Sequence, residues 1–309
     1  MHEIARLRPS DAIGGLVVAA TLLATGVGIA LALSPRLPVW ATGQVVLAAA
    51  LVEWFIVLHE CGHGTMFARR GPNRWAGWIA GWFSLIPFAT WRRIHQRHHK
   101  WTGWQDLDPT TAGLVPRPLG RLERATADWC WRLWIPLFAV LYRATNFWHV
   151  RRLRRLFPGV AGRRLTAWTL AHAAGYVVLV VLVGPVTMAR LAGVALVLSF
   201  VAQEVLLISQ HTHLPMTRSD GRGVAPYPPP AQERFTRSLR LPRLVSRLAL
   251  HFDAHELHHM FPAVPGYRLQ SIAYRPAHEV PAWRWIPAAR RVRGSVLLFQ
   301  NRDETGFDL

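Results

Sequence analysis

The stretch LVEWFIVLHECGHGTMF, residues 51–67, ends a long apolar run with the pattern His59-Glu60-x-x-His63. Two residues four positions apart share one face of a helix, so this helix would present both imidazoles on the same side. The pattern fits a zinc protease in which the glutamate is the general base, and it equally fits a helix that offers imidazoles to another metal. The remainder of the chain distinguishes the two.

Composition and hydropathy indicate an integral membrane protein. Of the 309 residues, 51% are hydrophobic and only 17% are charged, which is typical of a membrane protein with modest polar parts. Crossing a bilayer takes roughly 20 apolar residues, and four stretches are long enough: residues 13–33, 39–58, 165–184 and 186–209. The short turns SPRLP and VGPV join them in pairs. We expect an all-α integral membrane protein of one domain, residues 1–309, with four transmembrane helices in two hairpins.

The formal net charge of +19 is distributed as in a multi-pass membrane protein. Arginines gather between the second and third spans and after residue 215, whereas the tight turns carry almost none. The positive-inside rule then places both termini and the basic segments in the cytoplasm, and we expect a bacterial inner membrane. Topology and attraction to anionic lipids explain this charge better than nucleic acid does. A basic face would also steer an acidic redox partner.

Other apolar or amphipathic segments are too short or too basic to span. Residues 75–88 predict an interfacial or re-entrant segment, and the tryptophan-rich residues 128–148 predict a segment along the membrane surface. Residues 233–252 predict a basic amphipathic helix interrupted at Pro242. Residues 59–164 and 210–275 are expected to form a cytoplasmic histidine-rich cap, followed by a tail, residues 276–309.

Eleven of the fifteen histidines lie in four tight groups. Each H-x-x-H-H pattern places three imidazoles on one helix face, and imidazole suits zinc, copper, iron and nickel. Such faces would repel one another as protonated groups unless a metal held them. The groups are His59 with His63; His95, His98 and His99; His211 with His213; and His251, His255, His258 and His259.

The predicted topology brings these four groups to one side of the membrane. The second and fourth spans both run inward, so the histidines at their ends arrive at the cytoplasmic face, where the H-x-x-H-H segments also lie. Eight or more imidazoles are too many for one tetrahedral zinc and indicate two metal ions. Iron fits if the reaction is oxygen chemistry.

Three of these patterns, separated by paired spans, resemble the histidine boxes of the membrane fatty acid desaturase superfamily, which includes acyl desaturases, hydroxylases and carotenoid ketolases. The stretches QHTHLP, residues 210–215, and HELHHMFPAVPGYRL, residues 255–269, are similar to its acyl-lipid desaturase branch. The resemblance covers residues 59–269. The boxes are H-x-x-x-H at His59 and His63, and H-x-x-H-H at His95, His98, His99 and at His255, His258, His259.

The resemblance implies a non-haem di-iron centre, O₂ as co-substrate and a lipid or acyl-chain substrate. The expected reaction introduces a double bond into a fatty acyl chain. Hydroxylation or ketolation of a lipid or carotenoid stays open, because the outcome depends on how a C–H bond lies relative to the irons. No histidine-proline-glycine-glycine haem signature is present, so the electron donor is expected to be a separate ferredoxin or similar carrier with its reductase.

Carried over residue by residue, the resemblance makes the box histidines metal ligands, and no catalytic residue is expected beyond the metal centre. At the end of the fourth span, His213 is preferred to His211 as an additional ligand. His251 is either a further ligand or a group that contacts one. The expected ligands are His59, His63, His95, His98, His99, His213, His255, His258 and His259.

Four acidic residues are candidates for supporting these ligands. Asp108 is expected to hold a ligand imidazole through its other nitrogen, or else to form a simple turn with Pro109. Acidic groups within spans are costly and functional by default, so Glu53 and Glu204 are expected to hydrogen-bond ligand imidazoles or to form an interhelical polar pair. Glu60 is expected to be a structural acid or one that contacts a ligand imidazole, rather than a protease base.

Two other classes of protein explain the histidines less well. An intramembrane zinc protease needs His59, His63 and one more ligand, which leaves nine clustered histidines without a role. A membrane metal carrier or di-haem cytochrome predicts ligands in the middle of the spans, whereas these histidines lie at the span ends.

Overall fold

The computed structural model describes residues 7–309, which are mostly helical. The one sheet in this part of the chain pairs two-residue strands in parallel, β1 (Leu239–Arg240) with β2 (Val280–Pro281). The prediction of an all-α chain is confirmed. The expected position of the N-terminus concerns residues 1–6, which lie outside the described residues.

The chain divides into two compact units. The membrane-helix unit comprises Pro9–Arg93 and Val140–Gln203, and the histidine unit comprises Ile94–Ala139 and Glu204–Leu309, with residues 7 and 8. The prediction of one domain over residues 1–309 stays a prediction. Three of the boundaries between these units fall inside helices, in α4 (Phe88–Trp101), α6 (Leu137–Arg143) and α10 (Val194–His211).

Four helices are long and apolar enough to cross a membrane, as predicted. The second ends at His63, beyond the predicted residue 58, and the third begins at Val160, before the predicted residue 165. Their pairing in hairpins and their orientation stay predictions. The four are α1 (Asp11–Ala32), α2 (Leu37–His63), α8 (Val160–Val183) and the continuous stretch Pro185–His211, made of α9 (Pro185–Met188), η4 (Ala189–Gly193) and α10.

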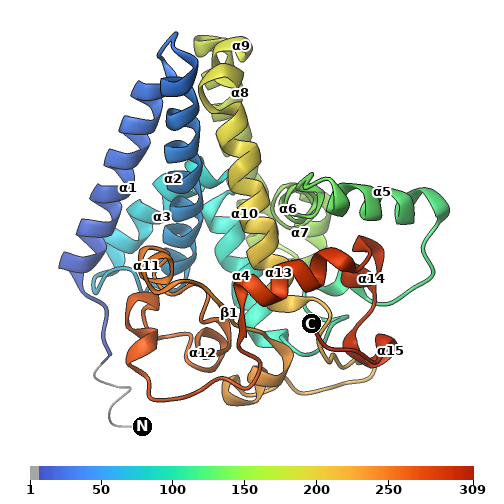
Figure 1. Cartoon of the computed structure of the whole chain (residues 1–309). Coiled ribbons are helices and arrows are strands. Elements are labelled where there is room, and N and C mark those ends of the chain that lie inside the picture. Colours follow the sequence, from blue (N-terminus) through green and yellow to red (C-terminus); the bar gives the residue numbers. More distant parts are fainter. Residues whose placement is uncertain (1–6) are drawn as a thin grey trace. The chain divides into compact units, whose positions relative to one another are not determined.

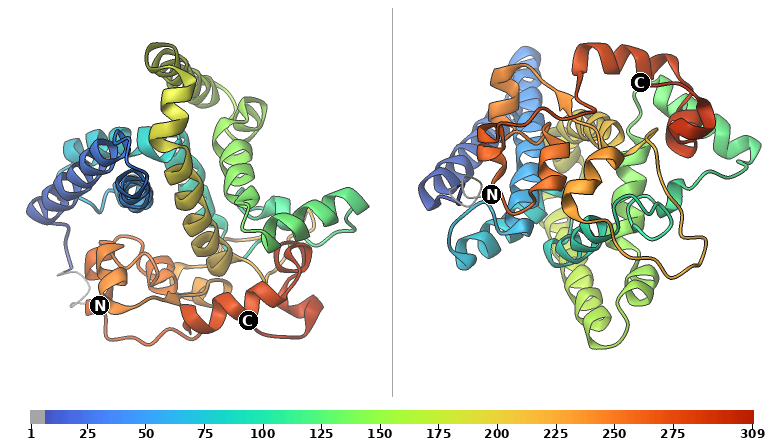
Figure 2. Two further views of the ribbon diagram at one scale, coloured as in Figure 1. Left: turned by 45° about the horizontal axis from the view of Figure 1, so that its top comes forward. Right: turned by 90° about the horizontal axis from the view of Figure 1, so that it is seen from below.

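In the membrane-helix unit, α1 lies alongside α2, with α3 (Arg70–Ser84) against α2 (Figure 1, Figure 2). Glycines permit the close approach of α1 and α2. A Cβ built on Gly43 would lie 2.6 Å from the Ala32 nitrogen and 2.9 Å from the Gly28 oxygen. The chain leaves α2 at Gly64, whose φ of 76° closes the helix in the left-handed conformation. The histidines at the end of α2 are therefore fixed by a regular helix end.

A buried glutamine explains the π-helical turn η4 within the fourth candidate span. Gln44 on α2 donates from Nε2 to the Leu191 carbonyl at 2.9 Å and accepts at Oε1 from the Ala195 N–H at 2.9 Å. The amide thus takes hydrogen bonds that a regular α-helix would make internally, and side-chain insertion of this kind produces such bulges. The unit is completed by η3 (Ala144–Trp148) and α7 (Val150–Leu156), which packs on α8.

Short helices joined by long irregular segments build the histidine unit. In both views of Figure 2 and in the contacts, α14 lies against α5, while α13 follows β2 and packs on both strands. The helical elements outside α4 and α10 are η2 (Ala112–Leu114), α5 (Arg121–Arg132), η5 (Pro229–Phe235), α11 (Arg243–Leu248), α12 (His255–Met260), η6 (Gly266–Ser271), α13 (Ala282–Arg291), α14 (Gly294–Phe299) and α15 (Arg302–Thr305).

One helix prediction, for a basic segment, was wrong. Residues 233–252 form the end of η5, strand β1 and α11 rather than an amphipathic helix, because long-range bonds such as Leu239 N–H to the Asp253 carbonyl (3.1 Å) replace helical ones. The tryptophan-rich residues 128–148 contain more than one helix: α5 ends at Arg132, and α6 (Leu137–Arg143) begins directly after Pro136. Proline cannot continue a helix that precedes it. The position of residues 128–148 along the membrane surface stays a prediction.

Replacing Gly43 by alanine should destabilise the protein, because the new methyl group would meet backbone atoms of α1 that cannot move aside. Overpacking of this kind typically costs about 1–3 kcal/mol. Thermal unfolding of the purified protein in detergent measures the effect. The matched control is Gly26→Ala on α1, where nothing lies within 4 Å of the position that the added methyl group would take; it should match the wild type or exceed it. Equal unfolding temperatures for G43A and G26A would contradict the packing.

Candidate metal centre

Four histidines of the histidine unit form one buried cluster. His98 comes from α4, His211 is the last residue of α10, and His255 and His259 lie on α12. One ring nitrogen from each lies within 4.8 Å of the other three, and the Nε2 atoms of His211 and His255 are 2.7 Å apart. We call these four residues the four-histidine cluster.

The same two helices, α4 and α12, carry a second group, formed by His95, His99 and His258. Nε2 of His99 lies 3.0 Å from Nε2 of His95 and 3.1 Å from Nε2 of His258. Two imidazole nitrogens, each about 2.1 Å from a shared ion and at right angles around it, would lie about 3.0 Å apart. The spacings in this three-histidine group therefore suit convergence on one cation.

The tautomer of His259 prepares it to bind a metal. Its Nδ1 donates to Oε1 of Gln232 at 3.0 Å, which leaves the lone pair on Nε2. This Nε2 is buried and has no hydrogen-bond partner among residues 7–309. Burial, followed by the neighbouring His99 and His255, holds the pKa of His259 well below its usual range. A neutral imidazole with an unused, buried lone pair is the form that a metal ligand must adopt.

The donor set therefore fits a metal ion of borderline type. Both groups offer imidazoles alone, without a cysteine or carboxylate among the clustered donors described. Neutral imidazoles suit iron, zinc and copper, whereas magnesium and calcium prefer oxygen ligands.

Asp108 lies where the sequence places it, beside a candidate ligand. Its Oδ2 lies 2.7 Å from Nδ1 of His98, and both side chains are buried. Its Oδ1 accepts from the N–H (2.8 Å) and the hydroxyl (2.9 Å) of Thr110, so it also forms the turn that follows α4. A carboxylate on the outer nitrogen fixes both the tautomer and the ring orientation of a metal-binding histidine. Asp108 therefore contacts a candidate ligand imidazole and also forms a turn, so the two alternatives expected from the sequence are compatible.

Gln232 is a supporting residue that sequence reasoning missed. Besides accepting from His259, its side-chain amide donates from Nε2 to the His99 carbonyl on α4 at 2.8 Å. This one buried amide joins the two helices that carry six of the clustered histidines. Gln232 stands on η5, outside every histidine pattern, and no local signal in the sequence identifies it.

Glu256 and Arg237 hold the short elements that carry the ligands. Glu256 accepts from the Ser238 N–H at 3.1 Å and from the His278 N–H at 2.6 Å, and burial raises its pKa to about 7. These bonds fix α12, which at six residues is too short to be stable alone. The buried Arg237 guanidinium donates to the carbonyls of Ser209 (2.9 Å) and His213 (3.0 Å), where α10 ends.

His211, not the preferred His213, lies in the four-histidine cluster. The helix α10 ends at His211, and the chain turns at His213 through a left-handed conformation with φ of 53°. The His213 ring is directed elsewhere: its Nε2 is 2.7 Å from the Thr305 hydroxyl. Burial and then Arg237 lower the pKa of His213 to about 4. The placement of the two rings favours His211 over His213, and which of them binds a metal stays a prediction.

Two further candidates in the histidine unit also lie apart from the imidazole groups. Nδ1 of His251 is 2.8 Å from the hydroxyl of Ser246, which donates to Asp253 at 2.7 Å. Glu204 accepts from the Ala139 N–H at 2.9 Å, at the start of α6. This carboxylate oxygen therefore caps a helix instead of making the expected hydrogen bond to a ligand imidazole.

In the membrane-helix unit, His59 and His63 lie in the last turn of α2 with ring centroids 4.8 Å apart. The carboxylate of Glu60 lies 3.2 Å from Nδ1 of His59 and accepts from the Thr65 hydroxyl at 2.8 Å. Glu60 therefore both contacts a candidate ligand imidazole and bonds the loop that follows α2; its role stays a prediction. Oε1 of Glu53 is buried without a hydrogen-bond partner in the described chain, so this oxygen does not make the expected bond to an imidazole.

Four candidate spans and two imidazole groups on shared helices define a class of protein: a helical protein with four helices that could cross a membrane and histidine clusters that could hold a metal. The chain belongs to the fatty acid desaturase family, whose sequence profile matches residues 14–287. The resemblance noted in the sequence is thereby confirmed.

Curated relatives at low identity are named as desaturases. The chain is 26% identical over 258 residues to a probable fatty acid desaturase of Sorghum bicolor, covering 78% of this chain and 64% of the relative. It is 38% identical over 82 residues to the sn-1 oleoyl-lipid 12-desaturase of Arthrospira platensis, covering 26% and 22%. It is 31% identical over 85 residues to the sn-1 acyl-lipid omega-3 desaturase (ferredoxin) of Synechocystis sp., covering 28% and 23%. Each match spans less than two thirds of the relative's length.

Replacing Asp108 by asparagine should weaken metal binding by about 10- to 100-fold, because the neutral amide no longer holds the His98 N–H as a carboxylate does. Metal content after dialysis against a graded chelator measures the affinity. The matched control is Asp106→Asn in the same segment, which removes the same charge from a side chain bonded to Ser219. Equal metal retention by D108N and D106N would contradict a role for Asp108 in holding the ligand.

Proposed function

We propose that the chain is an O₂-dependent di-iron membrane oxidoreductase that introduces a double bond into a fatty acyl chain. Membership of the fatty acid desaturase family and the desaturase names of its relatives support this reaction. The observation that carries the proposal is the presence of two imidazole groups on the same pair of helices, α4 and α12. Adjacent histidines on each helix direct one ring to each group.

One iron would be held by the four-histidine cluster, with His211 as the ligand from the fourth candidate span. The other would be held by His95, His99 and His258. His59 and His63 are assigned to this second iron on their H-x-x-x-H pattern, which matches the first box of the family. All ligands are then neutral imidazoles, and the centre keeps the positive charge of its metals.

When bound, the two irons would supply the oxygen activation and electron transfer that oxidation of an unactivated C–H bond requires. The chain's own residues prepare the site. Asp108 and Gln232 retain the outer ring protons of His98 and His259, so that the Nε2 lone pairs stay directed into the cluster. The burial of His98, His255 and His259 excludes water from the ligand nitrogens, which limits loss of the metal by hydration and protonation.

We further propose a membrane location, a lipid substrate and a separate electron donor. The four candidate spans form two hairpins in a membrane, with both termini and the histidine-rich cap in the cytoplasm. The substrate is a lipid acyl chain, and electrons come from a separate carrier. One relative's name specifies ferredoxin, and an acidic carrier of that kind would be attracted by a chain of net charge +19.

Expression with a ferredoxin and its reductase, followed by mass profiling of lipids and carotenoids, tests the reaction. We expect acyl chains that have lost two hydrogens, with carotenoids unchanged. His211→Asn should abolish this product because it removes a cluster ligand, whereas the matched variant His213→Asn should retain most of it. Products that gain oxygen would instead identify a hydroxylase or ketolase. Unchanged lipids with an iron-loaded preparation would contradict desaturation, and equal loss in both variants would contradict the choice of His211.

A further inference from the structure

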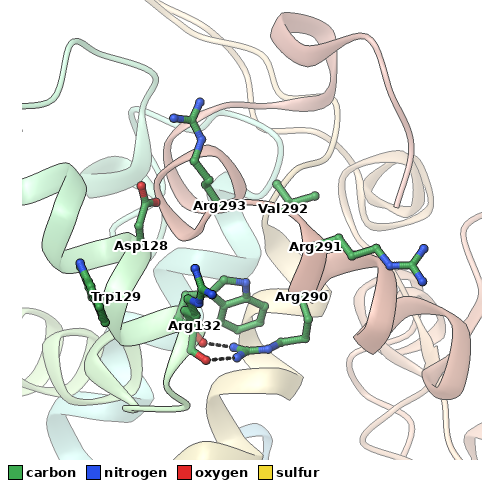
Figure 3. A pocket seen from close by; sticks show the side chains of 8 residues that line it. Asp128, Trp129, Arg132, Arg290, Arg291, Val292 and Arg293 are labelled. Atoms are coloured by element: carbon green, nitrogen blue, oxygen red, sulfur yellow. Dashed lines mark hydrogen bonds between the residues drawn. The ribbon is translucent and has the colours of Figure 1, made fainter.

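A cavity of about 530 Å³ opens between α5 and α13 of the histidine unit, apart from both imidazole groups. Figure 3 shows that basic side chains dominate its wall. We call it the arginine pocket. Its lining residues are Asp128, Trp129, Trp131, Arg132, Arg290, Arg291, Val292 and Arg293.

The pocket carries an uncompensated positive charge. Arg132, Arg291 and Arg293 are exposed, and none of them forms an ion pair within residues 7–309. The acidic residue of the lining, Asp128, accepts from the Ser295 N–H at 2.8 Å and therefore serves to fix the start of α14. Four guanidinium groups against one carboxylate leave a net charge of about +3 in the pocket.

The fourth arginine, Arg290, is held rigidly in the wall. Its guanidinium lies 4.7 Å from the ring centroid of Trp131 and 4.1 Å from that of Trp134. It also donates to the carbonyls of Trp131 and Arg132 at the end of α5, as the dashed lines in Figure 3 mark. This arginine fastens α13 to α5, so the pocket is formed before any ligand arrives.

Large apolar side chains adjoin the charged pocket at the end of α5. Trp129 is 62% exposed and Leu133 is 54% exposed, and Trp134 and Ile135 are exposed as well. Exposed tryptophan beside arginine is the combination that membrane–water interfaces favour. A small soluble anion would need the arginines alone, whereas an amphipathic anion uses both the charge and the apolar surface.

We propose that the arginine pocket binds the headgroup of an anionic phospholipid, with the exposed tryptophan and aliphatic side chains at and just after the end of α5 against the upper part of its acyl chains. Guanidinium groups match phosphate oxygens in a two-pronged geometry. The net charge of the pocket selects an anionic headgroup over a zwitterionic one, whose cationic amine the remaining arginines repel. Anionic lipids of the cytoplasmic leaflet supply this chemistry. The site is independent of the reaction proposed for the metal centre.

Binding to the full-length protein in neutral detergent tests the site without any turnover. The probes are short-chain phosphatidylglycerol, short-chain phosphatidylcholine, glycerol 3-phosphate and inorganic phosphate. We expect phosphatidylglycerol to bind about tenfold or more tightly than each of the others, as measured by native mass spectrometry and by the shift in unfolding temperature. Equal binding of phosphatidylcholine would overturn selection by charge. Equal binding of glycerol 3-phosphate or inorganic phosphate would overturn the contribution of the apolar rim and reduce the pocket to a phosphate site.

Paired double variants locate the site. Arg291→Gln with Arg293→Gln should weaken phosphatidylglycerol binding about tenfold or more. Arg151→Gln with Arg155→Gln removes the same charge from exposed positions on α7 and should leave it nearly unchanged. Metal content, which neither pair touches, reports that both proteins are folded. Equal weakening in the two pairs would assign the binding to overall charge and overturn the pocket.

Discussion

The structure of the histidine unit depends on one constraint: several imidazoles must stay neutral and keep a lone pair directed at the same point while they are buried. Protonated rings at Nε2 separations of 2.7–3.1 Å would repel one another. Hydrogen bonds at the Nδ1 atoms, on the outer side of the rings, favour the neutral tautomer whose Nε2 lone pair faces the cluster. Asp108 accepts a hydrogen bond from the Nδ1–H of His98, and Gln232 accepts one from that of His259, so each ring is oriented from outside the cluster. The candidate metal ligands are thus oriented by residues outside the cluster.

This constraint accounts for the many buried polar side chains around such short elements. A six-residue helix such as α12 cannot hold three histidines by its own stability. Glu256 joins it to the backbone of Ser238 and His278, and Arg237 donates hydrogen bonds to carbonyls at the end of α10. Each of these groups would be costly to bury alone, and each is satisfied by backbone groups that would otherwise lack partners. Loss of the polar network would therefore also disturb the geometry of the clustered histidines.

Local signals in the sequence predicted the parts of the structure that local physics determines. Apolar runs of sufficient length gave the four candidate spans, and H-x-x-H-H spacing placed three histidines on α4 and three on α12. Long-range contacts escaped prediction. Gln232 reaches His99 across 133 positions, and the backbone reversal at His213, which excludes that ring from the cluster, carries no signature in QHTHLP. Residues 233–252 looked helical because their charge pattern is amphipathic, yet tertiary bonds decide their path.

The clustered histidines are proposed to hold two iron ions, without haem or zinc. Elemental analysis of the protein purified after growth with balanced iron and zinc, combined with its visible absorbance, tests this proposal most directly. Two irons per chain with no haem absorbance, falling in the His211→Asn protein, are predicted. One zinc per chain, or a haem spectrum, would contradict a di-iron centre and would return His59-Glu60-x-x-His63 to the protease or cytochrome interpretations.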